Sequence, residues 1–308
     1  MSAQSRASER ASAVGRASEA RAGWAMSIPA LAAILLFFVL PAIASLFLSF
    51  TDFDIYALAD IGNLRFVGLQ NYERLLDNPL FWKAMTNTLL FVAVGTPFIV
   101  ALSLFAAMIV NSRWLKWRPL WRVALFAPYV TTLVATAVVW RYLLHTRYGL
   151  LNYLLSFFGV PPVDWLGSPT ASLPAILLFV AWKTFGYNMI IFLAALQTVP
   201  RELDEAARID GAGWLTRLRH VTLPAIAPTV LLVSVLTVAG MFQLFAEPYV
   251  MTQGGPAQST VTILYFMYEE GFKWWNLGSG AAVAFLLFLC ILAVTLVQLR
   301  LAKRSGAI

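Results

Sequence analysis

Apolar residues in this chain gather into six long runs separated by polar segments. A helix rises 1.5 Å per residue, so about 20 apolar residues cross the roughly 30 Å hydrocarbon core of a membrane. The pattern therefore predicts an all-α, polytopic membrane protein with six transmembrane helices. The predicted spans are Ser27–Phe50, Asn87–Val110, Trp121–Leu144, Ser172–Val199, Pro224–Ala246 and Leu277–Leu301.

Several of these runs contain residues that would weaken a helix in water. A membrane helix tolerates them where neighbouring groups satisfy the freed backbone carbonyls. The interruptions therefore do not reduce the number of predicted spans. They are Pro41, Pro97, Pro128, Gly186 and Gly240.

Composition supports the same class. Of 308 residues, 60% are hydrophobic and 12% are charged, whereas soluble proteins are about 45–50% apolar and about 25% charged. A soluble enzyme or nucleic-acid-binding protein would lack the polar surface that it needs in water. We therefore expect a lipid membrane and no nucleic acid among the partners, despite the net charge of +7.

The basic residues predict the orientation, because Lys and Arg are retained on the cytoplasmic side. Fifteen fall in the two tails and in the second and fourth loops, six fall in the other loops, and Lys183 lies inside a span. Both termini are therefore expected in the cytoplasm. The group of fifteen is Arg6, Arg10, Arg16, Arg21, Arg113, Lys116, Arg118, Arg122, Arg201, Arg208, Arg217, Arg219, Arg300, Lys303 and Arg304.

The chain is predicted to have three segments: a tail at each end and a transmembrane domain between them. Residues 1–26 have few bulky side chains and read as a disordered basic cytoplasmic tail; a cleaved signal peptide is the alternative, although the first apolar run is longer than a signal core. Residues 27–301 form the transmembrane domain. Residues 302–308 form a second cytoplasmic tail.

The residues of catalysis and metal binding are missing from this pattern. The chain has no GxxxxGK[ST] phosphate loop. His145 and His220 are expected on opposite sides of the membrane, and neither has a further ligand at metal-binding spacing. Cys290 is the single cysteine and lies in an apolar run. We expect no catalytic site, no metal and no cofactor in this chain.

The fourth loop, residues 200–224, has the most regular polar pattern. Leu203, Ala206, Ala207 and Asp210 share one face of a predicted helix, and acidic residues occupy its first turn, where they suit the helix dipole. Small residues on that face permit close docking. Gly211 and Gly213 are predicted to end the helix with left-handed geometry, and Pro224 to begin the next span.

The same loop resembles the EAA loop of ABC importer permeases. The matching elements are Glu205, Ala206 and Ala207, then Gly211 after three residues, and Val221–Pro224 after nine more, with Val221 where the family has Ile. Further stretches, in family order, are similar to permeases for maltose, glycerol-phosphate and multiple sugars. They are Phe66–Tyr72, Ala127–Tyr129, Trp182–Asn188, Ala194–Pro200 and Thr252–Pro256.

This resemblance implies a type I ABC importer permease fold with a cytoplasmic coupling helix, in a bacterial-type inner membrane. The chain would form half of a pathway for a sugar or sugar-like solute with a second permease subunit. ATP-binding subunits, which hold ATP and Mg, would drive it, and an extracytoplasmic solute-binding protein would deliver the solute. The residues implied in ATPase coupling are Glu205, Ala206, Ala207, Asp210, Gly211, Leu223 and Pro224.

Aromatic and amide side chains in the fourth and fifth spans are the candidates for the solute pathway, because sugar sites combine aromatic faces with hydrogen-bonding groups. Tyr187 matches a substrate-contacting tyrosine of maltose-type permeases, but helix packing is an equal alternative. The segment Met241–Phe245 departs from the asparagine-rich maltose pattern, which argues against maltose specificity. The candidates are Trp182, Lys183, Tyr187, Asn188, Thr237 and Gln243.

Lys183 has two readings. As an intramembrane charge it could hold a phosphate or an acidic sugar; it could instead reach a headgroup or pair with Glu247. Two other functions also stay open. A secondary transporter would place coupling carboxylates inside its spans, which this chain does not, and an amino-acid or peptide permease fits less well around Asn71 and Gly186.

Overall fold

The computed structural model describes residues 23–112 and 114–304, and these residues are almost entirely helical. Within these ranges the only β-pairing is an isolated bridge between Thr51 and Phe66. The elements run in the order η1(Leu35–Val39), α2(Leu40–Leu48), α3(Ile55–Ala59), η2(Ile61–Asn63), α4(Gln70–Leu76), α5(Pro79–Leu90), η3(Phe91–Gly95), α6(Thr96–Asn111), α7(Arg118–Val130), α8(Leu133–Leu143), α9(Leu150–Ser156), α10(Ser172–Thr198), α11(Arg201–Ile209), α12(Trp214–Arg217), η4(Leu218–Thr222), α13(Leu223–Ala225), α14(Ala227–Phe242), α15(Ala246–Met251), α16(Ile263–Tyr268), η5(Glu269–Lys273) and α17(Leu277–Arg304).

The predicted fold class is confirmed. Four helices are long and apolar enough to cross a membrane, and the number rises to six if each of two bent helix pairs is one span. The four are Gly23–Leu48, Pro79–Asn111, Ser172–Thr198 and Leu277–Arg304; the bent pairs are Arg118–Val130 with Leu133–Leu143, and Trp214–Ala225 with Ala227–Phe242.

Three prolines in the spans follow one structural rule. A five-residue π-helical segment ends two residues before Pro41, Pro97 and Pro224 in each case. A proline lacks the N–H that would bond the carbonyl four residues back, and its ring collides with that carbonyl. The wider π-turn moves the carbonyl aside, so the helix continues without a break through Pro41 and Pro97, whereas after Pro224 it bends at Ile226.

Pro128 has a different effect, and the predicted third span is wrong as a continuous helix. Thr131 and Thr132, just after it, adopt extended backbone conformations, so α7 ends at Val130 and α8 starts at Leu133. The two halves meet at 98°. The carbonyls left free at this break are partly buried and need partners.

The other span boundaries differ by shorter lengths. The second span begins at Pro79, eight residues before the predicted Asn87, and the fifth is bent by 77° near Ile226 and ends at Phe242 rather than Ala246. Residues 23–26, predicted to be part of a disordered tail, are helical, and the last helix continues to Arg304. Residues 1–22 and 305–308 lie outside the described part.

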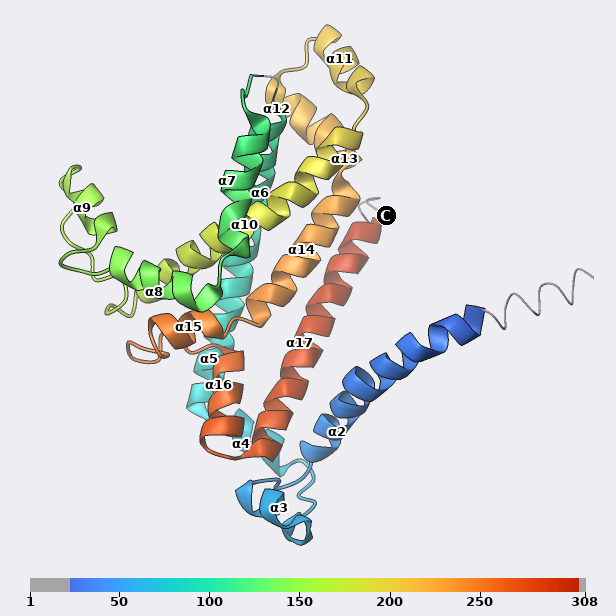
Figure 1. The fold of residues 1–308 in the computed structure, drawn as a ribbon, viewed down its shortest axis with the longest axis vertical. Helices are drawn as coiled ribbons and strands as arrows, with labels where there is room; N and C mark the ends of the chain where they lie inside the picture. The colour runs from blue at the N-terminus through green and yellow to red at the C-terminus, as the bar shows by residue number, and fades with distance from the viewer. Residues whose placement is uncertain (1–22, 113, 305–308) are drawn as a thin grey trace, which may run out of the picture.

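Helix α10 is the centre of the bundle. Its buried residues include Phe179, Met189 and Phe192, and it packs against α6, α7 and α14 (Figure 1). At Gly186 the contact is between backbones, because an added Cβ would lie 2.1 Å from the Leu125 carbonyl oxygen. This glycine therefore sets how closely α10 and α7 approach.

The bundle has two distinct ends (Figure 1). Helices α11 and α12 cap one end, together with the start of α7, while α3, α4 and η5 lie at the opposite end. The first span and α17 meet near α3 and diverge toward the other end. The long first span is exposed along almost its whole length, with none of its apolar window buried within this chain.

Candidate functional site

The fourth loop forms a short helix at the tip of the molecule, as its pattern predicts. Helix α11 begins after Pro200, which holds an extended conformation, and carries Glu202 and Asp204 in its first turn. Negative charge is favourable there because the free N–H groups at a helix start are partly positive.

A Schellman motif ends α11. The Gly211 N–H donates to the Arg208 carbonyl at 3.1 Å, and the Ala212 N–H donates to the Ala207 carbonyl at 2.9 Å. Gly211 has φ +78°, the left-handed geometry that the sequence predicts. Gly213 does not share it: its φ is −64°, and it starts α12 instead. The prediction of left-handed geometry was therefore right for Gly211 and wrong for Gly213.

The predicted face of α11 is largely exposed on the surface of the chain. Leu203 is 51% exposed, Ala206 and Asp210 are also exposed, and Ala207 is half-buried. Ile209, the last residue of the helix, is 87% exposed. A short amphipathic helix that exposes its apolar side chains is typical of a surface that another protein covers.

An ion pair joins α11 to the segment behind it. The Arg217 Nη1 of α12 donates to the Asp204 carboxylate at 3.1 Å. Leu223 and Pro224 lie in α13, where Leu223 is half-buried. Ile226 follows and packs into the core of α6, α10 and α14. A force on α11 would therefore reach the bundle through a short, packed connection.

Lys183 on α10 is buried, with 8% of its surface exposed, and faces the break between α7 and α8. Its Nζ donates to the Pro128 carbonyl at 3.0 Å, to the Thr131 carbonyl at 2.7 Å and to Thr131 Oγ1 at 3.3 Å. An ammonium group has three hydrogens, so these contacts use its full capacity. Glu247 lies near enough for electrostatic attraction, although the hydrogen bonds go to α7.

Asn188 and Thr237, both predicted for the pathway, contact each other. Asn188 Nδ2 of α10 donates to Thr237 Oγ1 of α14 at 3.0 Å, and that hydroxyl donates to the Val233 carbonyl at 2.7 Å. Both side chains are buried. The pair joins two spans by side-chain hydrogen bonds, which is a structural role.

Tyr187 and Tyr129 form an aromatic pair between α10 and α7. Their ring centroids are 4.7 Å apart and the planes differ by 18°. Both residues remain partly exposed, at 37% and 43%. Gln243 is exposed just after α14. Sequence reasoning named Tyr187 and missed Tyr129 as a site residue, although Tyr129 lies in a stretch that resembles the family.

Trp182 points into an aromatic cluster instead. Its ring centroid lies 5.4 Å from that of Trp140 on α8 and 6.3 Å from that of Phe179. Both neighbours belong to the same apolar core. Trp182 was predicted as a pathway candidate, and this arrangement supports helix packing for it instead.

The histidines lie apart from each other in the fold. His145 stacks on Tyr148, with centroids 3.5 Å apart, and His220 Nδ1 lies 3.0 Å from the Thr216 carbonyl. Within residues 23–112 and 114–304, no three His, Cys, Asp or Glu side chains are grouped so that they could hold a metal ion.

Comparisons with known proteins agree with this arrangement. Residues 11–306 match the family described as "Binding-protein-dependent transport system inner membrane component". The chain is 34% identical to a trehalose/maltose transport system permease protein of Thermococcus litoralis, over 92% of this chain and 95% of that protein. It is 33% identical to an sn-glycerol-3-phosphate transport system permease protein of Pectobacterium atrosepticum, over 92% and 96%.

A solved structure is similar in fold. It is a bacterial alginate ABC transporter in complex with an alginate pentasaccharide-bound periplasmic protein, with a TM-score of 0.78 and 21% sequence identity. The match covers 92% of this chain and 94% of the solved chain. The broken and bent helices described above therefore belong to a known architecture.

Proposed function

The chain belongs to the family of binding-protein-dependent transport system inner membrane components, and we propose that it is the permease subunit of an ATP-driven ABC importer for a sugar or sugar-like solute. It forms half of the translocation pathway. The solute class follows from the relatives, whose names specify trehalose, maltose and glycerol phosphate.

The exposed helix α11 is the observation that carries this proposal. It has the residue pattern of the EAA loop, stands at the tip of one end of the bundle and ends in a defined Schellman motif (Figure 1). Glu205, Ala206, Ala207, Asp210 and Gly211 would dock in a cleft of an ATP-binding subunit. Closure of two such subunits on ATP would then rotate the permeases between inward and outward access, as packed rigid bodies.

The distribution of basic residues supports the orientation. Helix α12, which carries Arg217, and the start of α7, which is Arg118, lie at the end that carries α11, whereas α4, which carries Arg74, lies at the opposite end (Figure 1). Positive residues remain on the cytoplasmic side during insertion. We therefore place α11 and both termini in the cytoplasm of a bacterial-type inner membrane, with α3, α4 and η5 outside.

The partners supply what this chain does not hold. Two ATP-binding subunits carry ATP and Mg, a second permease completes the pathway, and an extracytoplasmic solute-binding protein delivers the solute. A periplasmic protein is bound in the alginate transporter of similar fold. We assign no catalytic role to this chain, and it moves solute only as part of the complex.

In the pathway itself, Tyr187 and Tyr129 are the best candidates for contact with solute. Their stacked rings are partly exposed, and an aromatic face suits the apolar face of a sugar ring. Gln243 is exposed, and its amide can donate a hydrogen bond to a sugar hydroxyl group or accept one from it. Asn188, Thr237, Trp182 and Lys183 hold the surrounding helices in place.

A charge reversal on α11 tests the function. We expect Glu205→Lys to reduce uptake to background while the complex still assembles in the membrane, because the reversed charge repels the basic group that it meets on the ATP-binding subunit. Glu202→Lys, one turn earlier on the same exposed helix, is the matched control and should retain most of the uptake. Uptake of labelled sugar by cells with equal amounts of each variant is the measurement.

Normal uptake by Glu205→Lys at normal expression would contradict the assignment. Competition by unlabelled sugars, amino acids and peptides in the same assay separates a sugar permease from the amino-acid or peptide alternative. Inhibition by amino acids but not by sugars would transfer the chain to that class.

A further inference from the structure

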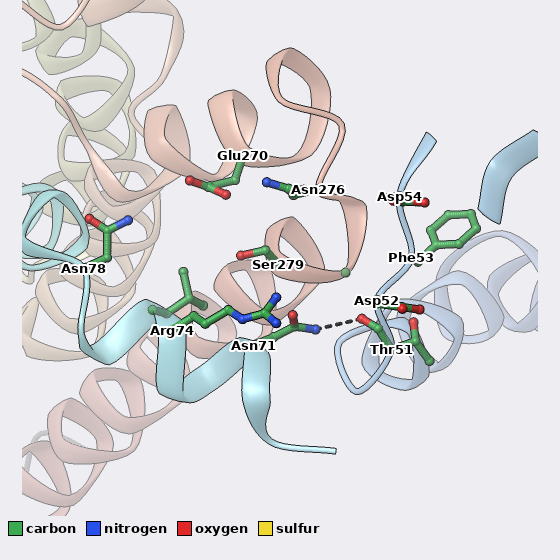
Figure 2. Close-up of a pocket in the computed structure, with 12 residues that line it drawn as sticks. Thr51, Asp52, Phe53, Asp54, Asn71, Arg74, Asn78, Glu270, Asn276 and Ser279 are labelled. Carbon is green, nitrogen blue, oxygen red and sulfur yellow. Dashed lines mark hydrogen bonds between the residues drawn. The ribbon is translucent and has the colours of Figure 1, made fainter. Parts of the chain in front are cut away.

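A polar cavity of about 240 Å³ lies at the end of the molecule opposite α11. Three parts of the chain that are distant in sequence surround it: residues 51–54 after the first span, helix α4, and the region from η5 to the start of α17 (Figure 2). None of the residues assigned to coupling or to the pathway lines it. Its function is therefore not explained by either.

The walls of the cavity are fixed by buried hydrogen bonds. Asn71 Nδ2 of α4 donates to the Ser49 and Thr51 carbonyls, each at 2.8 Å, and the Gly278 N–H of α17 donates to the Phe53 carbonyl at 2.8 Å. A Cβ at Gly278 would lie 2.2 Å from the Thr51 carbonyl oxygen. The cavity is thus preformed, with no loop that must fold to create it.

Negative charge dominates the lining. Asp52, Asp54 and Glu270 line the cavity with one basic residue, Arg74, and with three amide and two hydroxyl side chains. One oxygen of Asp52 accepts from the Arg65 N–H, and one oxygen of Asp54 accepts from the Tyr56 and Ala57 N–H groups. Each of these two carboxylates is therefore partly satisfied by the local backbone.

Glu270 differs from its neighbour Glu269. Glu269 forms an ion pair with Lys273 at 2.6 Å. Glu270 is half-buried and interacts with the Asn276 side chain, and within the described residues no cation pairs with it. Burial raises the pKa of the Glu270 carboxyl, its hydrogen bond with Asn276 lowers it, and the nearby Glu269 raises it further. A cation from outside would relieve this cost.

The size of the cavity indicates what enters it. Pockets for small-molecule ligands usually measure about 300–1,000 Å³, so this one is small for an oligosaccharide but adequate for one long side chain. Figure 2 shows Glu270 of η5 and Arg74 of α4 around the same space, with Ser279 drawn between them in this view. An extended basic side chain fits both the volume and the charge.

We propose that this cavity receives a lysine or arginine side chain of the extracytoplasmic solute-binding protein, with Glu270 as its acceptor. The proposal rests on the function proposed above and adds the docking site on this chain. Asp52 and Asp54 add attraction at the entrance, and Arg74 orients the incoming group by excluding it from the α4 side. The site is at the end that faces the binding protein, as far as possible from α11.

The test uses the complete complex in liposomes, with stimulation of ATP hydrolysis by the solute-loaded binding protein that copurifies from the native membrane. We expect Glu270→Gln to raise the half-saturating concentration of binding protein about tenfold, while basal ATP hydrolysis stays unchanged. Glu270→Asp should recover part of the loss. Glu269→Gln, one residue away and outside the cavity, should leave the half-saturating concentration unchanged.

Three outcomes would overturn the proposal. The first is a Glu270→Gln complex with the same half-saturating concentration as the wild type. The second is an equal loss in Glu269→Gln, which would indicate a general effect of charge on η5. The third is a changed solute preference at saturating binding protein, which would make the cavity a solute site. Absence of stimulation in the wild type would instead contradict the proposed function itself.

Discussion

Lys183 shows how a single residue supports a broken helix. The break after Val130 leaves carbonyl groups of α7 without helical partners, and a buried free carbonyl is costly. The ammonium group lies at the C-terminal end of α7, which carries partial negative charge. Its contacts with Pro128 and Thr131 give the free carbonyls a donor and place a positive charge at the negative end of α7. A phosphate or acidic sugar would have to compete with these contacts.

Replacing Lys183 separates the two roles. We expect Lys183→Met to destabilise the protein by about 1–3 kcal/mol, because two partly buried carbonyls lose their donor. Melting of the purified complex in detergent measures this loss. Lys183→Gln keeps a hydrogen-bond donor, so its melting temperature should lie between those of Lys183→Met and the wild type. It should transport the same range of charged and neutral solutes as the wild type. A Lys183→Gln complex of normal stability that lost only anionic solutes would make Lys183 a substrate residue.

Gly186, on the same helix as Lys183, provides a prediction about steric packing. An alanine there would drive its Cβ into the Leu125 backbone, and overpacking of this kind costs about 1–3 kcal/mol or more. We expect Gly186→Ala to lower the melting temperature and the yield of folded protein. Gly240→Ala is the control, since nothing lies within 4 Å of its added Cβ. Equal stability of both variants would show that α7 and α10 are not held in backbone contact.

The sequence could predict helices but not their breaks. All six apolar runs appear as helices, yet four prolines of similar context act differently. Pro41 and Pro97 follow π-turns within continuous helices, whereas bends of 98° and 77° follow Pro128 and Pro224. Apolar periodicity reports burial, and it is silent on backbone direction. The Lys183 side chain that bonds the Pro128 carbonyl at this bend lies 55 residues later in the chain, beyond any local pattern.

Helix α11 was predicted almost completely, because its signals are local. Its start, its exposed face and its stop at Gly211 follow from neighbouring residues. Contacts between spans were predicted less well, since the residues that form them are far apart in the sequence. Tyr129 was missed as the partner of Tyr187, and the cavity at Glu270 joins segments more than 200 residues apart. Such sites need tertiary contacts that a single sequence does not reveal.

The stop of α11 provides a prediction at the scale of the element. Gly211→Ala forces a side chain into left-handed geometry, which costs about 1–2 kcal/mol, and should loosen the Schellman motif. We expect ATP-driven uptake to fall severalfold at normal expression, because the docking face of α11 shifts. Gly213→Ala, at φ −64° with nothing near its Cβ, should transport normally. A loss in Gly213→Ala alone would contradict this account of the loop.

The two ends of the molecule have different surfaces. One end presents the exposed helix α11, and the cavity lined by Asp52, Asp54 and Glu270 lies at the opposite end, where Figure 1 shows α3 and α4. The bundle between them is held by α10, with backbone contact at Gly186 and hydrogen bonds at Lys183 and Asn188. The first span is largely uncovered by this chain. These features suit one half of a larger assembly that transmits movement across a membrane.

The most direct test of the central claim is an affinity pull-down of this chain from its native membrane, with mass spectrometry of the accompanying proteins and uptake by the recovered complex in liposomes. We predict an ATP-binding subunit and a second permease, solute uptake only with ATP, and loss of the ATP-binding subunit in Glu205→Lys. Recovery of the chain alone, with solute uptake in liposomes that contain no ATP, would contradict the account and identify a secondary transporter.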